Sequence, residues 1–109
     1  MTCEPWDVVA VPFPFTERLG EKKRPALVLS KKAFNRAGHT VLAMVTSTAH
    51  RRWPGDVDLA HWKATGLRTA CLVRLKLFTL DNRLLMRRIG SLSPADRRVV
   101  GQSLRRHLE

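Results

Sequence analysis

Short apolar, β-branched runs separated by proline, glycine and charged residues make up most of this chain, and that pattern predicts short strands. The run at 40–46 is apolar at successive positions, so we expect a central strand that is buried on both faces. Shorter runs at 56–59, 78–80 and 86–89 predict additional short strands. The main strands are expected at 7–13, 26–29, 40–46 and 69–76.

One substantial helix is predicted, at the end of the chain. Ser93 is suited to cap it, Pro94 fits its first position and Asp96 stands where a capping-box acid belongs. Apolar residues then recur on one helical face, with arginines mostly elsewhere. The polar segments 15–23 and 47–55 are expected to be loops, 31–38 a connection too short for a secure helix, and 61–65 a single helical turn.

These elements indicate a mainly β protein, a small barrel with a C-terminal helix. The 109 residues fit one domain spanning 1–109 and can bury a core without cross-links. No apolar stretch approaches the roughly 20 residues that cross a bilayer. Cys3 and Cys71 are the only cysteines, and no basic-then-apolar leader opens the chain, so we expect a cytoplasmic protein.

The charge of the chain favours a polyanionic partner. Twenty Lys and Arg face nine Asp and Glu, which gives a net charge of +11, and 14 of the 20 are Arg. The planar, paired donors of a guanidinium match a phosphate group well. The composition therefore favours recognition of phosphate groups by a chain whose partner is nucleic acid, an acidic protein or an anionic membrane surface, while arginines kept for solubility are the alternative.

Candidate chemistry centres on one basic and hydroxyl-bearing region. Arg24 lies at the entry to the second strand and Thr46 at the exit of the third. If these strands are adjacent and antiparallel, the two residues are neighbours at one rim. A guanidinium beside a hydroxyl suits a phosphodiester, because both stabilise charge on phosphoryl oxygens. Taken alone, a solvated basic face explains the same residues, and Ser47 or Thr48 competes with Thr46.

Other residues are candidates for binding RNA rather than for catalysis. Lys23 and Arg74 are plausible phosphate contacts, and Ser47 adjoins Thr46. Arg51, Arg52 and Trp53 combine basic groups with an aromatic ring on which a base can stack, although a solvated loop has the same composition. No metal or cofactor is expected, because the four histidines are scattered and none pairs with a cysteine at ligand spacing.

Several segments resemble PemK/MazF-like toxins, in the order that this family has them. They are 6–16, 22–30, 43–47, 66–67, 73–81 and 89–93. The resemblance implies an SH3-like β-barrel of the PemK/MazF/CcdB type, usually a homodimer. It implies an endoribonuclease that needs neither metal nor ribosome, cuts single-stranded RNA by 2′-hydroxyl attack and is neutralised by a cognate acidic antitoxin. By position, Arg24 matches the family's catalytic arginine and Thr46 its catalytic hydroxyl.

Two residues depart from the family pattern. Trp6 stands where many relatives have glycine, and Cys71 where many have serine. Two other functions remain open at this point, because fold alone does not settle function. One is a toxin of the same fold that does not cut RNA, either gyrase-directed or a degenerate RNA binder. The other is a basic barrel that binds structured RNA without cleavage.

Overall fold

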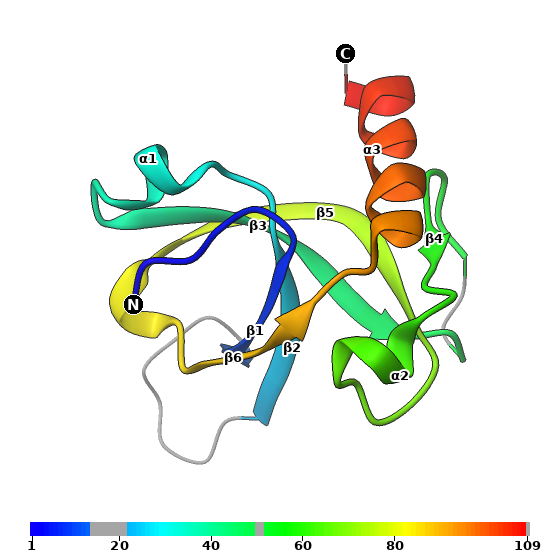
Figure 1. Cartoon of the computed structure of the whole chain (residues 1–109), viewed down its shortest axis with the longest axis horizontal. Coiled ribbons are helices and arrows are strands. Elements are labelled where there is room, and N and C mark those ends of the chain that lie inside the picture. Colours follow the sequence, from blue (N-terminus) through cyan, green and yellow to red (C-terminus); the bar gives the residue numbers. More distant parts are fainter. Residues whose placement is uncertain (14–21, 50–51, 109) are drawn as a thin grey trace.

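A computed structural model describes residues 1–13, 22–49 and 52–108, which form one antiparallel sheet and a long C-terminal helix (Figure 1). The sheet order is β4-β5-β3-β2-β1-β6, and the sheet curls into a half-barrel with β4 and β6 at its edges. The predicted mainly β architecture with a terminal helix is confirmed. The elements are β1 (Asp7–Phe13), β2 (Lys22–Val28), α1 (Lys32–Asn35), β3 (His39–Ser47), β4 (Val57–Asp58), α2 (Trp62–Thr65), β5 (Cys71–Asp81), the 3-10 turn η1 (Asn82–Leu84), β6 (Arg87–Ser91) and α3 (Pro94–Leu108).

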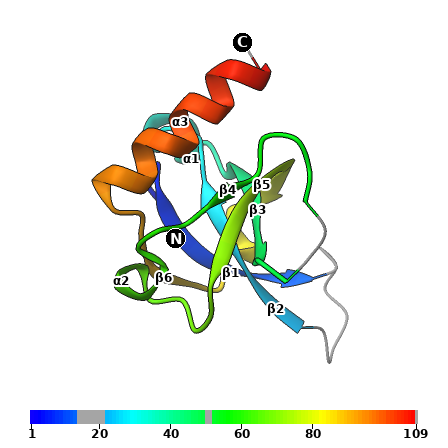
Figure 2. The ribbon, with the colours of Figure 1, turned by 90° about the vertical axis from the view of Figure 1, so that its right-hand side faces the viewer.

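Both faces of the sheet are buried, which explains why its strands are apolar at successive positions. Side chains alternate between faces, so Val8 of β1 joins one core cluster and Val9 the other. The first cluster includes Val100 of α3, and α3 and α2 lie on the same side of the curled sheet (Figure 2). The second cluster includes Cys3 and Leu85, contributed by the N-terminal segment and the turn after η1.

Strand β2 begins four residues before the predicted strand. Its polar start pairs with β1, with Lys22 opposite Phe13 and Arg24 opposite Val11. Residues 22–24 are therefore part of the strand because their backbone pairs with β1, although their side chains are exposed and charged. The predicted loop 47–55 is confirmed from Thr48 onward over its described residues, whereas Ser47 is the last residue of β3. Residues 14–21, most of the first predicted loop, lie outside the described residues.

Strand β5 is one continuous strand where two were predicted. Ala43 of β3 pairs with Leu77, and the next residue, Met44, pairs with Arg74. Two residues of β5 therefore bulge out of the ladder, and the strand continues across the charged break that the sequence shows at Lys76.

The segment predicted as a plain connection at 31–38 contains the short helix α1. Tertiary contacts support it, because the buried side chain of Asn35 donates to the carbonyl oxygens of Cys3 and Ser30, at 2.9 and 3.0 Å. A four-residue helix has no strong signal of its own in a sequence. Within the described residues, no helix is both long and apolar enough to cross a membrane.

Trp6 has a left-handed backbone conformation, with a φ of +75°. This conformation strains residues other than glycine, which agrees with the preference for glycine in many PemK/MazF-like toxins. Two hydrogen bonds hold the backbone there, from Trp6 N to Val28 O at 2.8 Å and from Leu92 N to Trp6 O at 3.0 Å. The half-buried indole packs against the first core cluster, which offsets part of the strain.

The start of α3 ties the helix to the loop before α2. Ser93 caps the helix as predicted, its Oγ accepting from the Asp96 N–H at 3.2 Å. The carboxylate of Asp96 instead accepts from the N–H groups of Ala60 and His61, both at 3.0 Å. Asp96 is 2% exposed, so it satisfies two backbone donors within the fold as well as the positive end of the helix.

Replacing Asp96 with alanine leaves two part-buried N–H groups without their acceptor. We expect the free energy of unfolding, measured by urea denaturation, to fall by about 2–4 kcal/mol. The control is Asp58→Ala, which removes an exposed acid paired with Arg52 and should cost less than about 1 kcal/mol. Equal losses in the two variants would contradict the role assigned to Asp96.

Candidate functional site

A groove of about 550 Å³ lies at the end of the sheet where β2 begins and β3 ends. Both strand ends are visible in the lower half of Figure 1, away from the C-terminal end of α3. Five strands and the segment between α2 and β5 contribute to the groove. The lining residues are Ala10, Lys23–Pro25, Met44–Ser47, Gly66–Thr69, Cys71, Arg74, Phe78, Arg87 and Ile89.

Arg24 and Thr46 both line this groove, on adjacent antiparallel strands as predicted. Ala26 of β2 pairs with Met44 of β3, and the same register continued by two residues places Arg24 opposite Thr46. Arg24 is exposed and Thr46 is half-buried. The geometry therefore offers one charged and one hydroxyl donor at the same rim.

The groove is electropositive. Five basic side chains line it, and no carboxylate does so among the described residues. Concave surfaces with one sign of charge concentrate ligands of the opposite sign. Three hydroxyl side chains accompany the cations and can donate to phosphoryl oxygens. The basic residues are Lys23, Arg24, Arg68, Arg74 and Arg87, and the hydroxyl residues are Thr46, Ser47 and Thr69.

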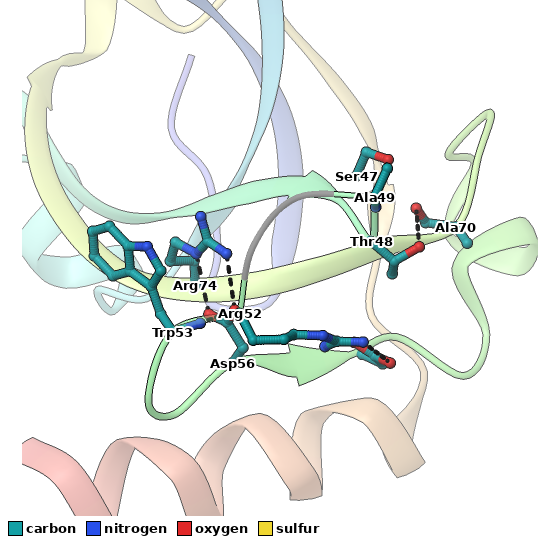
Figure 3. Close-up of polar contacts among 9 residues, drawn as sticks. Ser47, Thr48, Ala49, Arg52, Trp53, Asp56, Ala70 and Arg74 are labelled. Carbon is teal, nitrogen blue, oxygen red and sulfur yellow. Dashed lines mark hydrogen bonds and ion pairs between the residues drawn. The ribbon is translucent and has the colours of Figure 1, made fainter.

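Arg74, a predicted phosphate contact, is held by an acid (Figure 3). Its Nε and Nη2 donate to the two carboxylate oxygens of Asp56, at 3.2 and 2.9 Å. The side chains of Arg74 and Asp56 are 9% and 3% exposed. Asp56 also accepts from the Trp53 N–H at 2.8 Å, so the pair anchors the turn that carries Trp53.

The ring of Trp53 covers the guanidinium of Arg74. The Arg74 Cζ lies 4.8 Å from the ring centroid, and the Nζ of Lys76 lies 5.9 Å from it. Both distances suit cation–π attraction. Trp53 is nevertheless 43% exposed, so part of the ring remains available to a ligand.

The carboxyl of Asp56 is more acidic than usual. Burial opposes its ionisation, but the hydrogen bonds from Arg74 and the Trp53 N–H outweigh burial, and the pKa of Asp56 lies below its ordinary value. The ion pair with Arg74 is therefore formed at neutral pH.

The remaining predicted contacts are distributed unevenly around the groove. Lys23 is exposed and Ser47 half-buried in the lining, where the Ser47 Oγ accepts from the Ala49 N–H at 3.2 Å. Arg52 lies outside the lining and makes a two-pronged ion pair with Asp58, whose pKa is lowered by this hydrogen bond. Arg51 lies outside the described residues.

Arg68, Thr69 and Arg87 also line the groove, although their local sequence does not single them out. They are brought together because the end of α2 packs closely against β6. A Cβ added at Gly66 would lie 3.0 Å from the Ile89 carbonyl oxygen, and one at Gly90 only 2.0 Å from that of Thr65. The glycines are visible in the sequence, but their close contacts with Ile89 and Thr65 are not.

The described histidines lie away from the groove, and the one cysteine that lines it is protonated. His39, His61 and His107 are absent from its described lining, and His50 lies outside the described residues. Cys71 does line it, but burial raises the pKa of the thiol and keeps it protonated at neutral pH. Within the described residues, no three His, Cys, Asp or Glu side chains gather where they could hold a metal ion.

Comparison with known proteins gives one consistent result. A family model described as "PemK-like, MazF-like toxin of type II toxin-antitoxin system" matches residues 4–108. Comparison with curated protein sequences gave no match. Solved structures are similar over nearly their full length. A mycobacterial endoribonuclease in complex with its cognate antitoxin is 23% identical, with a TM-score of 0.76, over 97% of this chain and 94% of that one. A MazE–MazF structure from Deinococcus radiodurans is 25% identical, with a TM-score of 0.73, over 96% and 95%.

The Asp56–Arg74 pair predicts an acid-sensitive part of the stability. Because the folded-state pKa of Asp56 is lowered, its contribution is present above the unfolded pKa near 3.9 and is lost as pH falls below it. We expect Asp56→Asn to lose about 2–4 kcal/mol of unfolding free energy at pH 7. In urea titrations, that difference should shrink below about pH 4. A difference that is the same at pH 7 and at about pH 3 would contradict the assignment, and Asp58→Asn is the exposed control.

Proposed function

The chain belongs to the family of PemK-like, MazF-like toxins of type II toxin–antitoxin systems, and we propose that it is an endoribonuclease that cuts single-stranded RNA. The observation that supports this most directly is the placement of Arg24 and Thr46 on facing positions of a groove lined by cations. A phosphodiester bound there meets an exposed guanidinium and a hydroxyl together.

The proposed reaction needs no metal or cofactor. The ribose 2′-hydroxyl loses its proton to solvent, its oxygen attacks the adjacent phosphorus, and the bond from phosphorus to the 5′-oxygen breaks. The 5′-oxygen takes up a proton from solvent, which leaves a 2′,3′-cyclic phosphate and a free 5′-hydroxyl. Negative charge grows on the non-bridging oxygens in the transition state, and that is the charge a positioned guanidinium stabilises.

Arg24 is proposed to stabilise this charge and to donate toward the leaving oxygen. Thr46 is proposed to donate a hydrogen bond to a non-bridging oxygen and so orient the phosphate, with the neighbouring Ser47 as an added donor. Thr46 is half-buried on β3, so its position is fixed by the strand rather than by a mobile loop.

The rest of the RNA is proposed to follow the basic surface. Lys23 lines the groove beside Arg24, and Arg52 and Trp53 lie on the connection that leaves β3. A base stacked on the exposed part of Trp53 would add about 1–3 kcal/mol of binding energy. Arg74 is proposed to act by holding Trp53 in place through Asp56.

A cognate antitoxin and a second copy of the chain are the proposed protein partners. The mycobacterial relative was solved with its cognate antitoxin. An extended acidic segment of an antitoxin suits the same groove, because it would replace the RNA phosphates with carboxylates on the same guanidinium groups. The working unit is proposed to be a cytoplasmic homodimer.

Cleavage of a long single-stranded RNA in EDTA, with the product ends mapped, tests the enzyme. Wild type should cut at a short recurring motif and leave cyclic phosphates. We expect Arg24→Ala to lower kcat by about 100- to 1000-fold, and Thr46→Val by about 10- to 100-fold. The control is Thr79→Val, which removes an exposed hydroxyl outside the groove lining. A folded wild type that binds RNA but never cuts would favour a non-catalytic member of the family.

The pH dependence of cleavage tests the same chemistry independently. Arginine and hydroxyl side chains keep their protons between about pH 5 and pH 8, whereas the 2′-hydroxyl becomes easier to ionise as pH rises. We expect kcat/KM to rise smoothly over this range, close to tenfold per pH unit. A bell-shaped profile with an inflection near pH 6.5 would indicate a histidine instead. Alanine variants of His39, His50 and His61 identify the residue in that case.

A further inference from the structure

Two arginines that line the groove, Arg68 before β5 and Arg87 on β6, have no acid partner among the described residues. Arg68 and Arg87 are both exposed, and neither makes an ion pair or hydrogen bond with any other described residue. Acids neutralise four other arginines, of which only Arg74 lines the groove, in the pairs Arg52–Asp58, Arg74–Asp56, Arg83–Asp81 and Arg88–Asp7. The groove wall therefore carries the positive charges of Arg68 and Arg87, which no described acid neutralises.

The strand register places Arg87 across β1 from the Arg24 region. Arg87 of β6 pairs with Ala10 of β1, and Ala10 pairs with Pro25 of β2, the residue that follows Arg24. Two strand spacings separate the backbones of β6 and β2, about 10 Å. Ala10 lines the groove between them, and its methyl side chain leaves room above the sheet for a ligand.

The position of Arg68 is coupled to that of Arg87. Arg68 follows α2 closely, and α2 is pressed against β6 at the Gly66–Ile89 and Gly90–Thr65 contacts. Gly66 has a φ of +98°, which turns the chain at the end of α2 toward the groove. A loop residue and a strand residue thus both line the groove, and close packing of α2 against β6 holds the elements that carry them.

We infer that Arg68 and Arg87 form a second phosphate-binding subsite, which holds a phosphodiester of the RNA other than the one that is cut. Its ligand class, single-stranded RNA, rests on the proposed function. Guanidinium groups make paired, charge-assisted hydrogen bonds to phosphate oxygens. This phosphate does not react, so the contact is the same before and in the transition state. The subsite therefore lowers KM and leaves kcat unchanged.

Binding tests the subsite without requiring cleavage. The probe is a fluorescein-labelled 2′-O-methyl dodecauridylate, which lacks the attacking hydroxyl, and its Kd is measured by fluorescence anisotropy from about 50 to 300 mM salt. Each of Arg68→Gln and Arg87→Gln should weaken binding several-fold and reduce the slope of log K against log salt by about 0.7. The control with the same charge change is Arg98→Gln, an exposed residue of α3 outside the groove lining.

Cleavage kinetics separate this subsite from the reacting centre. Arg87→Gln should raise KM several-fold at unchanged kcat, whereas Arg24→Ala should lower kcat. A fall in kcat for Arg87→Gln would overturn the proposal and place Arg87 on the scissile phosphate. Salt slopes of Arg68→Gln and Arg87→Gln equal to that of Arg98→Gln would also overturn it, even if wild type cleaves RNA. Absence of cleavage by wild type would instead refute the proposed function, and the salt slopes would still report on the subsite.

Discussion

The pairing of β2 with β3 is the constraint on which the rest of the site depends. Backbone hydrogen bonds set Ala26 against Met44, and the same register brings Arg24 and Thr46 to one rim. Both strands bury side chains on both faces, so a slip of one residue would exchange the two core clusters and cost much of the hydrophobic free energy. Core packing therefore enforces the register, and the register positions the two residues proposed for catalysis.

The distribution of acids is as informative as the excess of bases. The nine acidic residues are few, and several of them neutralise arginines away from the groove or hold backbone donors, as Asp96 does. Asp56 contacts a residue of the groove, because it pairs with Arg74 and holds it under Trp53, but Asp56 itself does not line the groove. Among the described residues the groove is thus lined by basic side chains and by no carboxylate, and a concave surface of one charge sign attracts a polyanion.

Close backbone approach is a second structural requirement of the site. The contacts at Gly66 and Gly90 allow α2 to lie against β6, which brings the loop carrying Arg68 to the same wall as Arg87. Trp6, directly before β1, shows the opposite solution, because two backbone hydrogen bonds and packing on the core keep a large side chain in a conformation suited to glycine. Both cases show local backbone geometry being decided by neighbouring elements.

The amino-acid sequence by itself determined the type and approximate position of the main elements. Alternating and continuous apolar runs specify strands at β1 and β3, and Ser93 with Pro94 specifies the start of α3, because these signals are local. It also predicted that Arg24 and Thr46 are neighbours on the condition that their strands pair antiparallel, a condition that the structure meets. Only the tertiary structure decided that Arg74 is paired with Asp56, that β5 continues through its bulge, and that Arg68 and Arg87 line the same groove. These features depend on contacts between residues distant in the chain, and a local pattern of residue types does not encode which distant partner a side chain will meet.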